Sequence, residues 1–87
     1  HGYQVSPIKL EALITSCPGV TDAAVVREIH EDEEIPAAYV VGTATSEQVM
    51  AFVAERVPGY EKVRAVHHVD TIPRSAAGKI LRRELRS

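Results

Sequence analysis

The chain has 87 residues, of which 45% are hydrophobic and 25% charged, and it carries a formal net charge of −2. This length supports one small domain with a single core, and the composition is that of an ordinary globular chain. The single cysteine excludes a disulfide within the chain, and no apolar run approaches the roughly 20 residues of a membrane span. Without a signal peptide, we expect a cytoplasmic location. Because the chain starts at His1 in the middle of a pattern, we expect it to be a piece of a longer protein.

Residues 6–19 predict the first helix. Ser6 is a good N-cap and Pro7 suits the first helical position, and apolar residues then recur at helical spacing as far as Cys17. Pro18-Gly19 ends the pattern. We interpret Cys17 as a small core residue rather than a nucleophile.

Two strands of a hairpin are predicted next, over residues 20–29 and 35–41. The charged residues 30–34 join them. The acids of this connection lack the glycine turn and the alternating ligands of a hard-cation site, so a solvated loop is favoured over a metal site.

A capping box at Thr45 and Gln48 starts a second helix, and residues 65–69 predict a third strand. The adjacent histidines His67 and His68 point to opposite faces of that strand, so they cannot both bind one metal ion. The predicted order is α-β-β-α-β-α. It describes a small α+β domain with a three-stranded sheet flanked by helices and with no metal site.

The stretch after the third strand contains the strongest candidate for chemistry. Pro73 ends the extended segment, and the small residues Ser75–Gly78 allow a backbone to approach a ligand closely. Lys79 follows directly, and the four-residue spacing of Leu81 and Leu85 predicts a short amphipathic helix. We therefore expect an ammonium on a flexible loop anchored by a small helix, which suits a phosphate or carboxylate ligand.

Positive charge is also concentrated at this end. Residues 72–87 contain five basic groups and one acidic group, whereas residues 1–71 contain five basic and eleven acidic groups. This predicts an anionic partner for the basic end. Nucleic acid is not expected, because the four aromatic residues are scattered and no RNA-binding or zinc-ligand signature is present.

Two motifs define a family resemblance. The phosphate-cradling pattern G-x-x-x-x-G-K-[ST] fails, since Pro73 replaces the first glycine and Ile80 the hydroxyl residue. The pattern P-x-x-x-x-G-K-x-x-R, filled by Pro73, Gly78, Lys79 and Arg82, closely resembles the C-terminal signature of acyl-adenylate-forming enzymes. Residues 2–11 resemble the family's hinge-proximal motif, G-[FY]-Q-[VI]-x-P-x-x-[LIV]-E. The resemblance therefore covers essentially all of residues 1–87 and identifies them as the mobile C-terminal lid domain.

The resemblance implies roles for individual residues. Lys79 takes the place of the catalytic lysine that bridges the acyl carboxylate and the α-phosphate during adenylation, and Gly78 is expected at the bound cofactor. After rotation of the lid, Gly2, Tyr3 and Gln4 are expected at the coenzyme A and adenylate site. Gln4 favours the coumarate- and fatty-acyl-CoA ligase branch, where peptide synthetases usually carry arginine. His1 stands where these ligases often have a lysine that contacts CoA, which departs from the pattern.

The implied partners follow from the same family. We expect the N-terminal adenylation domain of the same protein, a carboxylic acid, ATP with Mg²⁺ bound by that missing domain, and CoA as acceptor. The isolated domain is expected to be inactive. A relative using another acceptor, such as an adenylation domain or a luciferase, is one alternative. Another is a recognition module for a GNAT-type lysine acetyltransferase, with Lys79 as the acetylated residue and Arg74, Arg82 and Arg83 available to hold that partner.

Overall fold

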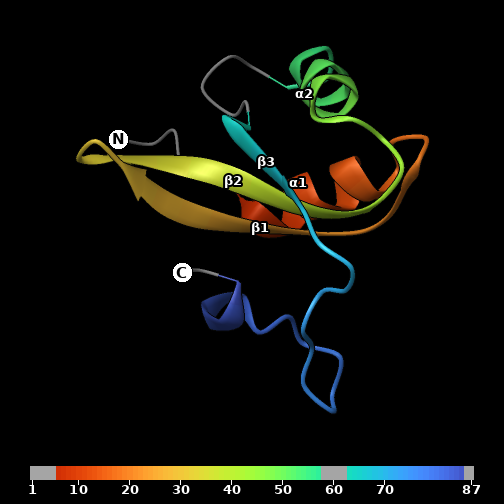
Figure 1. The fold of residues 1–87 in the computed structure, drawn as a ribbon, viewed down its shortest axis with the longest axis vertical. Coiled ribbons are helices and arrows are strands. Elements are labelled where there is room, and N and C mark those ends of the chain that lie inside the picture. The colour runs from red at the N-terminus through yellow and green to blue at the C-terminus, as the bar shows by residue number, and fades with distance from the viewer. Residues whose placement is uncertain (1–5, 58–62, 86–87) are drawn as a thin grey trace.

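The computed structural model describes residues 6–57 and 63–85. Its elements, in chain order, are α1 (Pro7–Thr15), β1 (Val20–His30), β2 (Glu33–Gly42), α2 (Ser46–Ala54), β3 (Ala65–His68) and the 3₁₀ turn η2 (Arg82–Glu84). The predicted α+β class with a three-stranded sheet is confirmed (Figure 1). No helix in the described ranges is long and apolar enough to cross a membrane.

Both helices begin where their capping residues predict. The Ser6 side chain accepts a hydrogen bond from the Lys9 N–H at 3.4 Å, and proline occupies the first turn of α1. At α2, the Thr45 hydroxyl accepts from the Gln48 N–H at 3.1 Å. The Gln48 side chain accepts in return from the Thr45 N–H at 2.8 Å, which completes the predicted capping box.

The sheet has the order β1-β2-β3 and is mixed. β1 and β2 form an antiparallel hairpin in which His30 pairs with Glu33, so the turn consists of Glu31 and Asp32 alone. Both turn residues have positive φ angles, 52° and 67°, as a two-residue type I′ hairpin turn requires. The strands therefore extend further than predicted and take in most of the charged loop. α2 then crosses over to place β3 parallel to β2.

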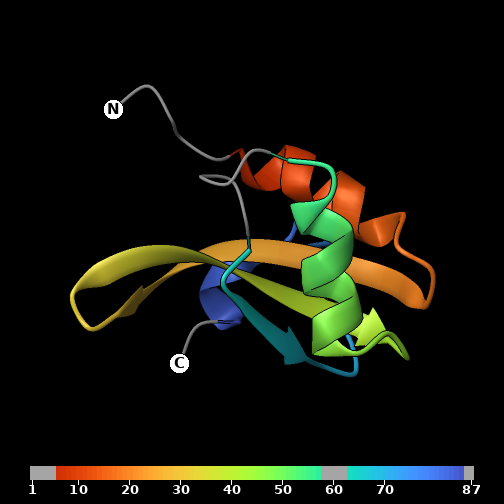
Figure 2. The ribbon, with the colours of Figure 1, turned by 90° about the horizontal axis from the view of Figure 1, so that it is seen from above.

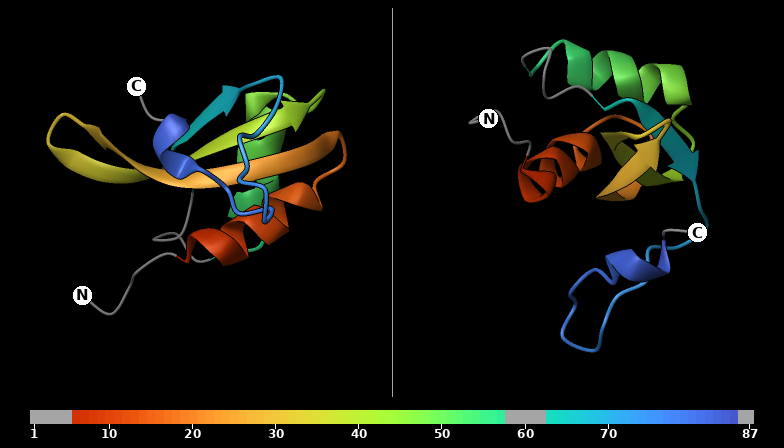
Figure 3. Two further views of the ribbon diagram at one scale, coloured as in Figure 1. Left: turned by 90° about the horizontal axis from the view of Figure 1, so that it is seen from below. Right: turned by 90° about the vertical axis from the view of Figure 1, so that its left-hand side faces the viewer.

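The sheet is buried on both faces. One face packs against α1 and α2, whose buried side chains include Leu10, Ile14, Val49 and Val53. Cys17 belongs to this core at 5% exposure, which confirms it as a core residue. Figures 2 and 3 show both helices on this side and the C-terminal segment on the other.

The opposite face is covered by the chain after β3. Ile72 is buried there against Ala24, Val26, Ala37 and Tyr39. Ile80 and Leu85 pack against the same cluster. The predicted amphipathic helix is a 3₁₀ turn of three residues instead, although its leucine anchor is present. The few hydrogen bonds of so short a segment cannot offset the free-energy cost of helix nucleation. Its conformation is therefore determined by packing on the sheet.

Candidate functional site

Lys79 lies in a tight hairpin of the C-terminal segment. Arg74 and Ile80 form an antiparallel bridge at its base. The Ser75 carbonyl accepts from the Gly78 N–H at 2.9 Å, and the Ser75 N–H donates to the Lys79 carbonyl at 2.8 Å. Gly78 has φ +87°, the left-handed conformation with which a three-residue hairpin loop closes. The residue before Lys79 is therefore glycine because the turn needs a positive φ angle at this position.

The expected flexible loop is thus a hydrogen-bonded turn. The Ser75 hydroxyl adds a third contact by accepting from the Lys79 N–H at 3.2 Å. A Cβ built on Gly78 would meet no atom within 4 Å, so the space beside this backbone is open. The role of Gly78 at a bound cofactor stays a prediction. The open space beside its backbone is compatible with a cofactor there.

The Lys79 ammonium has no acidic partner within the described domain. It is exposed, and within residues 6–57 and 63–85 its ammonium makes no ion pair or hydrogen bond. Arg83 is likewise exposed and unpaired in that part of the chain. These two cations are available to an external anion.

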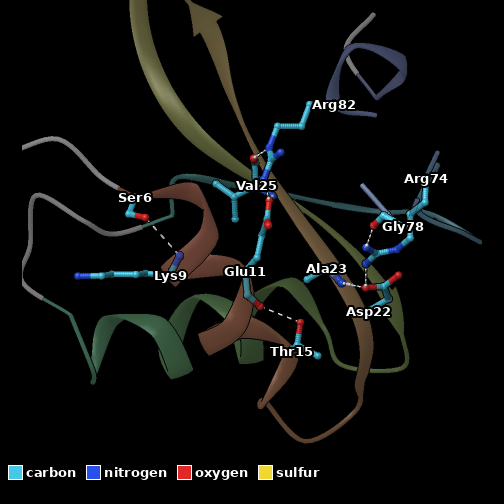
Figure 4. Close-up of polar contacts among 10 residues, drawn as sticks. All are labelled: Ser6, Lys9, Glu11, Thr15, Asp22, Ala23, Val25, Arg74, Gly78 and Arg82. Carbon is cyan, nitrogen blue, oxygen red and sulfur yellow. Dashed lines mark hydrogen bonds and ion pairs between the residues drawn. The ribbon is translucent and has the colours of Figure 1, made fainter. Parts of the chain in front are cut away.

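Arg74 and Arg82, in contrast, are engaged within the domain. Arg74 Nη2 lies 2.7 Å from Asp22 Oδ1, and its Nη1 donates to the Gly78 carbonyl at 3.0 Å (Figure 4). Arg82 pairs with Glu11. Two of the three flanking arginines therefore already have acidic partners within the domain, and their expected contact with an external partner stays a prediction. A net charge count misses this because it treats paired and unpaired arginines alike.

The Glu11–Arg82 pair joins the two ends of the chain at the edge of the sheet. Glu11, only 9% exposed, accepts from the Val25 N–H at 2.8 Å and from the Arg82 guanidinium. Arg82 Nε donates to the Val25 carbonyl at 3.0 Å (Figure 4). The two side chains thus satisfy the outward N–H and C=O groups of Val25 on β1, an edge strand. Glu11 and Arg82 are the last residues of the two sequence motifs, and that was the one signal available for their pairing.

A second polar cluster surrounds Glu28 on the face that carries the C-terminal segment. Its carboxylate accepts from Tyr39 and lies 3.0 Å from His30 Nε2 and 3.2 Å from His67 Nε2. Burial alone would raise the pKa of Glu28, but the hydrogen bonds from Tyr39, His30 and His67 outweigh it, and the pKa is lowered. His68 instead contacts the Ala44 carbonyl at 2.8 Å, so the two adjacent histidines face apart as predicted.

Three of the predicted site residues, Gly2, Tyr3 and Gln4, lie outside the described residues. The structure brings Gly78 and Lys79 together in one turn, and it adds Arg74 and Asp22 as neighbours of that turn. Sequence reasoning missed Asp22, because nothing in the sequence of β1 distinguishes it from a solvated strand residue.

Comparison with known proteins gives one consistent result. A family model described as the AMP-binding enzyme C-terminal domain matches residues 9–79, more than half of the chain. A 4-coumarate–CoA ligase of Pinus taeda is 46% identical over 89 residues, covering 99% of this chain and 17% of the relative. A Mycobacterium tuberculosis fatty acyl CoA synthetase superposes with a TM-score of 0.87 at 34% identity, covering 94% of this chain and 17% of that one.

A benzoate CoA ligase from Burkholderia xenovorans LB400 gives a TM-score of 0.86 at 34% identity. The match covers 95% of this chain and 18% of the ligase. The chain thus spans about a sixth of the length of the curated relative that it matches.

Proposed function

The chain belongs to the family of AMP-binding enzyme C-terminal domains, and from that premise we propose that residues 1–87 are the mobile lid of an ATP-dependent, AMP-forming acyl-CoA synthetase. Its partners are the N-terminal domain of the same protein, a carboxylic acid, ATP with Mg²⁺ held by that domain, and CoA. The observation that carries the proposal is the exposed Lys79 ammonium, presented on a hydrogen-bonded turn with no acidic partner in the described domain.

Adenylation requires such a charge. The substrate carboxylate attacks the α-phosphate in line, so two anions must meet while negative charge spreads over the phosphoryl oxygens. An ammonium delivered by lid closure stabilises that charge only when the site is shut, which couples chemistry to closure. We assign this role to Lys79.

Thioester formation is the second half of the proposed reaction. Here the lid rotates, Lys79 withdraws, and residues 2–4 approach the adenylate for attack by the CoA thiol. The isolated domain lacks the ATP site and the acyl pocket, and we expect it to be inactive alone.

The test separates the two half-reactions in the full-length ligase. Lys79→Ala should lower acid-dependent pyrophosphate exchange by about 10²–10³-fold, because one preorganised charge is removed. Thioester formation from supplied acyl-adenylate and CoA should fall much less. Lys9→Ala, at another exposed lysine of the domain, is the matched control. Equal losses in both half-reactions would contradict the division of roles, and transfer of the acyl group to an acceptor other than CoA would favour the alternative branch.

We further propose that a GNAT-type acetyltransferase modifies Lys79, because its ammonium is exposed and free of partners in the described part of the domain. Acetylation converts the ammonium into a neutral amide, so the modified enzyme should lose adenylation and keep thioester formation. Peptide mass spectrometry after incubation with transferase and acetyl-CoA should find the label on Lys79. Label spread evenly over Lys9, Lys62 and Lys79 would indicate nonspecific chemistry.

Charge reversal at the flanking arginines can test recognition by the acetyltransferase, but the positions differ in their effect on the fold. Arg82→Glu would place a carboxylate against Glu11 and should destabilise the fold, so Arg82 is unsuited to a charge-reversal test of recognition. Arg83→Glu is the appropriate variant, since Arg83 is exposed and makes no ion pair within the described ranges.

A further inference from the structure

Arg74 holds the peptide group on which Lys79 is mounted. The Gly78 carbonyl and the Lys79 N–H belong to one peptide unit. Arg74 Nη1 donates to that carbonyl at 3.0 Å (Figure 4). The Lys79 N–H donates to the Ser75 hydroxyl at 3.2 Å. Both polar atoms of the unit are therefore fixed by side chains of the same hairpin.

This peptide unit is the point at which the lysine's direction is set. Gly78 has φ +87° and no Cβ, so it restricts its own rotation less than any other residue would. Rotation of the Gly78–Lys79 peptide would swing the Cα–Cβ bond of Lys79, and with it the ammonium. Two hydrogen bonds across the unit oppose that rotation.

Asp22 ties the same guanidinium to the sheet. Its Oδ1 lies 2.7 Å from Arg74 Nη2 and also accepts from the Ala23 N–H at 2.9 Å. Asp22 stands beside the bulge in β1, directly before the buried run that starts at Ala23. The planar fork of an arginine can serve two acceptors in fixed directions, which a lysine cannot do. The contacts therefore run from β1 through Asp22 and Arg74 to the peptide of Lys79.

We propose that Arg74 is a positioning residue for the Lys79 ammonium in adenylation, with Asp22 as its anchor. This rests on the proposed function of Lys79 and adds to it. The rival interpretation is a surface ion pair without functional effect. The Arg74 and Asp22 side chains are 39% and 33% exposed, so their pair contributes little to stability, and unfolding measurements should barely change. A kinetic effect without a stability effect therefore distinguishes the two interpretations.

The experiment uses the full-length ligase and measures kcat and KM of pyrophosphate exchange, thioester formation from supplied acyl-adenylate, and urea unfolding. Arg74→Ala should lower kcat of exchange by about 10- to 100-fold, since a misplacement of about 1 Å can cost that much. Thioester formation should stay within about twofold, because Lys79 is then withdrawn. Arg74→Lys should restore little of the lost kcat of exchange, because lysine lacks the planar fork. Asp22→Ala should lower kcat of exchange less than Arg74→Ala does. Arg27→Ala is the control: Arg27 is 34% exposed and pairs with Glu34 elsewhere on the sheet.

A double variant tests whether Arg74 acts through Lys79. In a Lys79→Ala background, Arg74→Ala should cause no further loss of exchange. A multiplied loss would mean that Arg74 contacts the phosphate itself, and an equal loss of thioester formation would mean general damage; either overturns the proposal. Wild-type exchange in Arg74→Ala, alongside a loss in Lys79→Ala, would also overturn it while leaving the function of Lys79 intact. If Lys79→Ala itself retains exchange, the proposed function fails first.

Discussion

Replacing Arg82 by alanine should destabilise the domain, because this side chain connects the C-terminal segment to β1 and α1. Its Nε donates to the Val25 carbonyl at 3.0 Å, and its Nη2 contacts the Glu11 carboxylate. The substitution leaves the Val25 carbonyl without that donor. It also leaves Glu11, at 9% exposure, with the Val25 N–H as its remaining partner.

The size of the loss follows from burial. Breaking a fully buried ion pair costs about 3–5 kcal/mol, whereas a hydrogen bond to a charged group contributes about 1.5–3 kcal/mol. The Glu11 side chain is 12% exposed and that of Arg82 is 31%, so water can partly replace the guanidinium. We therefore expect a loss of about 2–3 kcal/mol, a large part of the roughly 5–15 kcal/mol that stabilises a domain.

Urea unfolding of the 87-residue chain, followed by circular dichroism, measures the change. Arg83→Ala is the control, since this neighbouring arginine is exposed and should change the free energy of unfolding by no more than about 0.5 kcal/mol. A double-mutant cycle with Glu11→Gln should give a coupling of about 1 kcal/mol or more. If Arg82→Ala costs no more than Arg83→Ala, or the cycle shows no coupling, the reasoning from burial is refuted.

Two further predictions concern Glu28 and Gly2. The lowered pKa of Glu28 means that its stabilisation is present above its ordinary value of 4.5 and is lost as pH falls through the folded-state pKa. Glu28→Gln should therefore flatten the acid limb of a plot of unfolding free energy against pH, and an unchanged slope would contradict the assignment. Gly2→Trp in the full-length ligase should obstruct the path of the CoA thiol and spare pyrophosphate exchange, the reverse of Lys79→Ala. A parallel fall in exchange would point to misfolding instead.

Local signals predicted most of the fold. The caps at Ser6 and Thr45 define the starts of both helices, and the apolar run at residues 23–26 becomes a strand buried on both faces. These features depend on residues a few positions apart, which a sequence displays directly. The 3₁₀ turn near Leu85 was mistaken for an α-helix, because leucine spacing reports a buried side and not the length of the element.

The candidate site was predictable only in its central residue. Lys79 stands out through its motif, but its surroundings depend on pairings between distant parts of the chain. Arg74 meets Asp22 across 52 residues, and Arg82 meets Glu11 across 71. Such pairings arise when the C-terminal segment packs across the sheet, so the sequence shows the charges and not which of them neutralise one another.

The four motif residues contribute to the Lys79 turn in different ways. The Pro73 carbonyl accepts from the Leu81 N–H at 2.9 Å, so this residue closes the base of the hairpin. Gly78 supplies the left-handed turn, and Arg82 fastens the segment to the sheet. Of the two charged motif residues, Arg82 is paired, whereas the Lys79 ammonium makes no polar contact within the described domain. Pro73, Gly78 and Arg82 therefore hold the segment and its turn, and Lys79 projects a charge from it; this arrangement supports the proposed role of Lys79 in preorganised electrostatic catalysis.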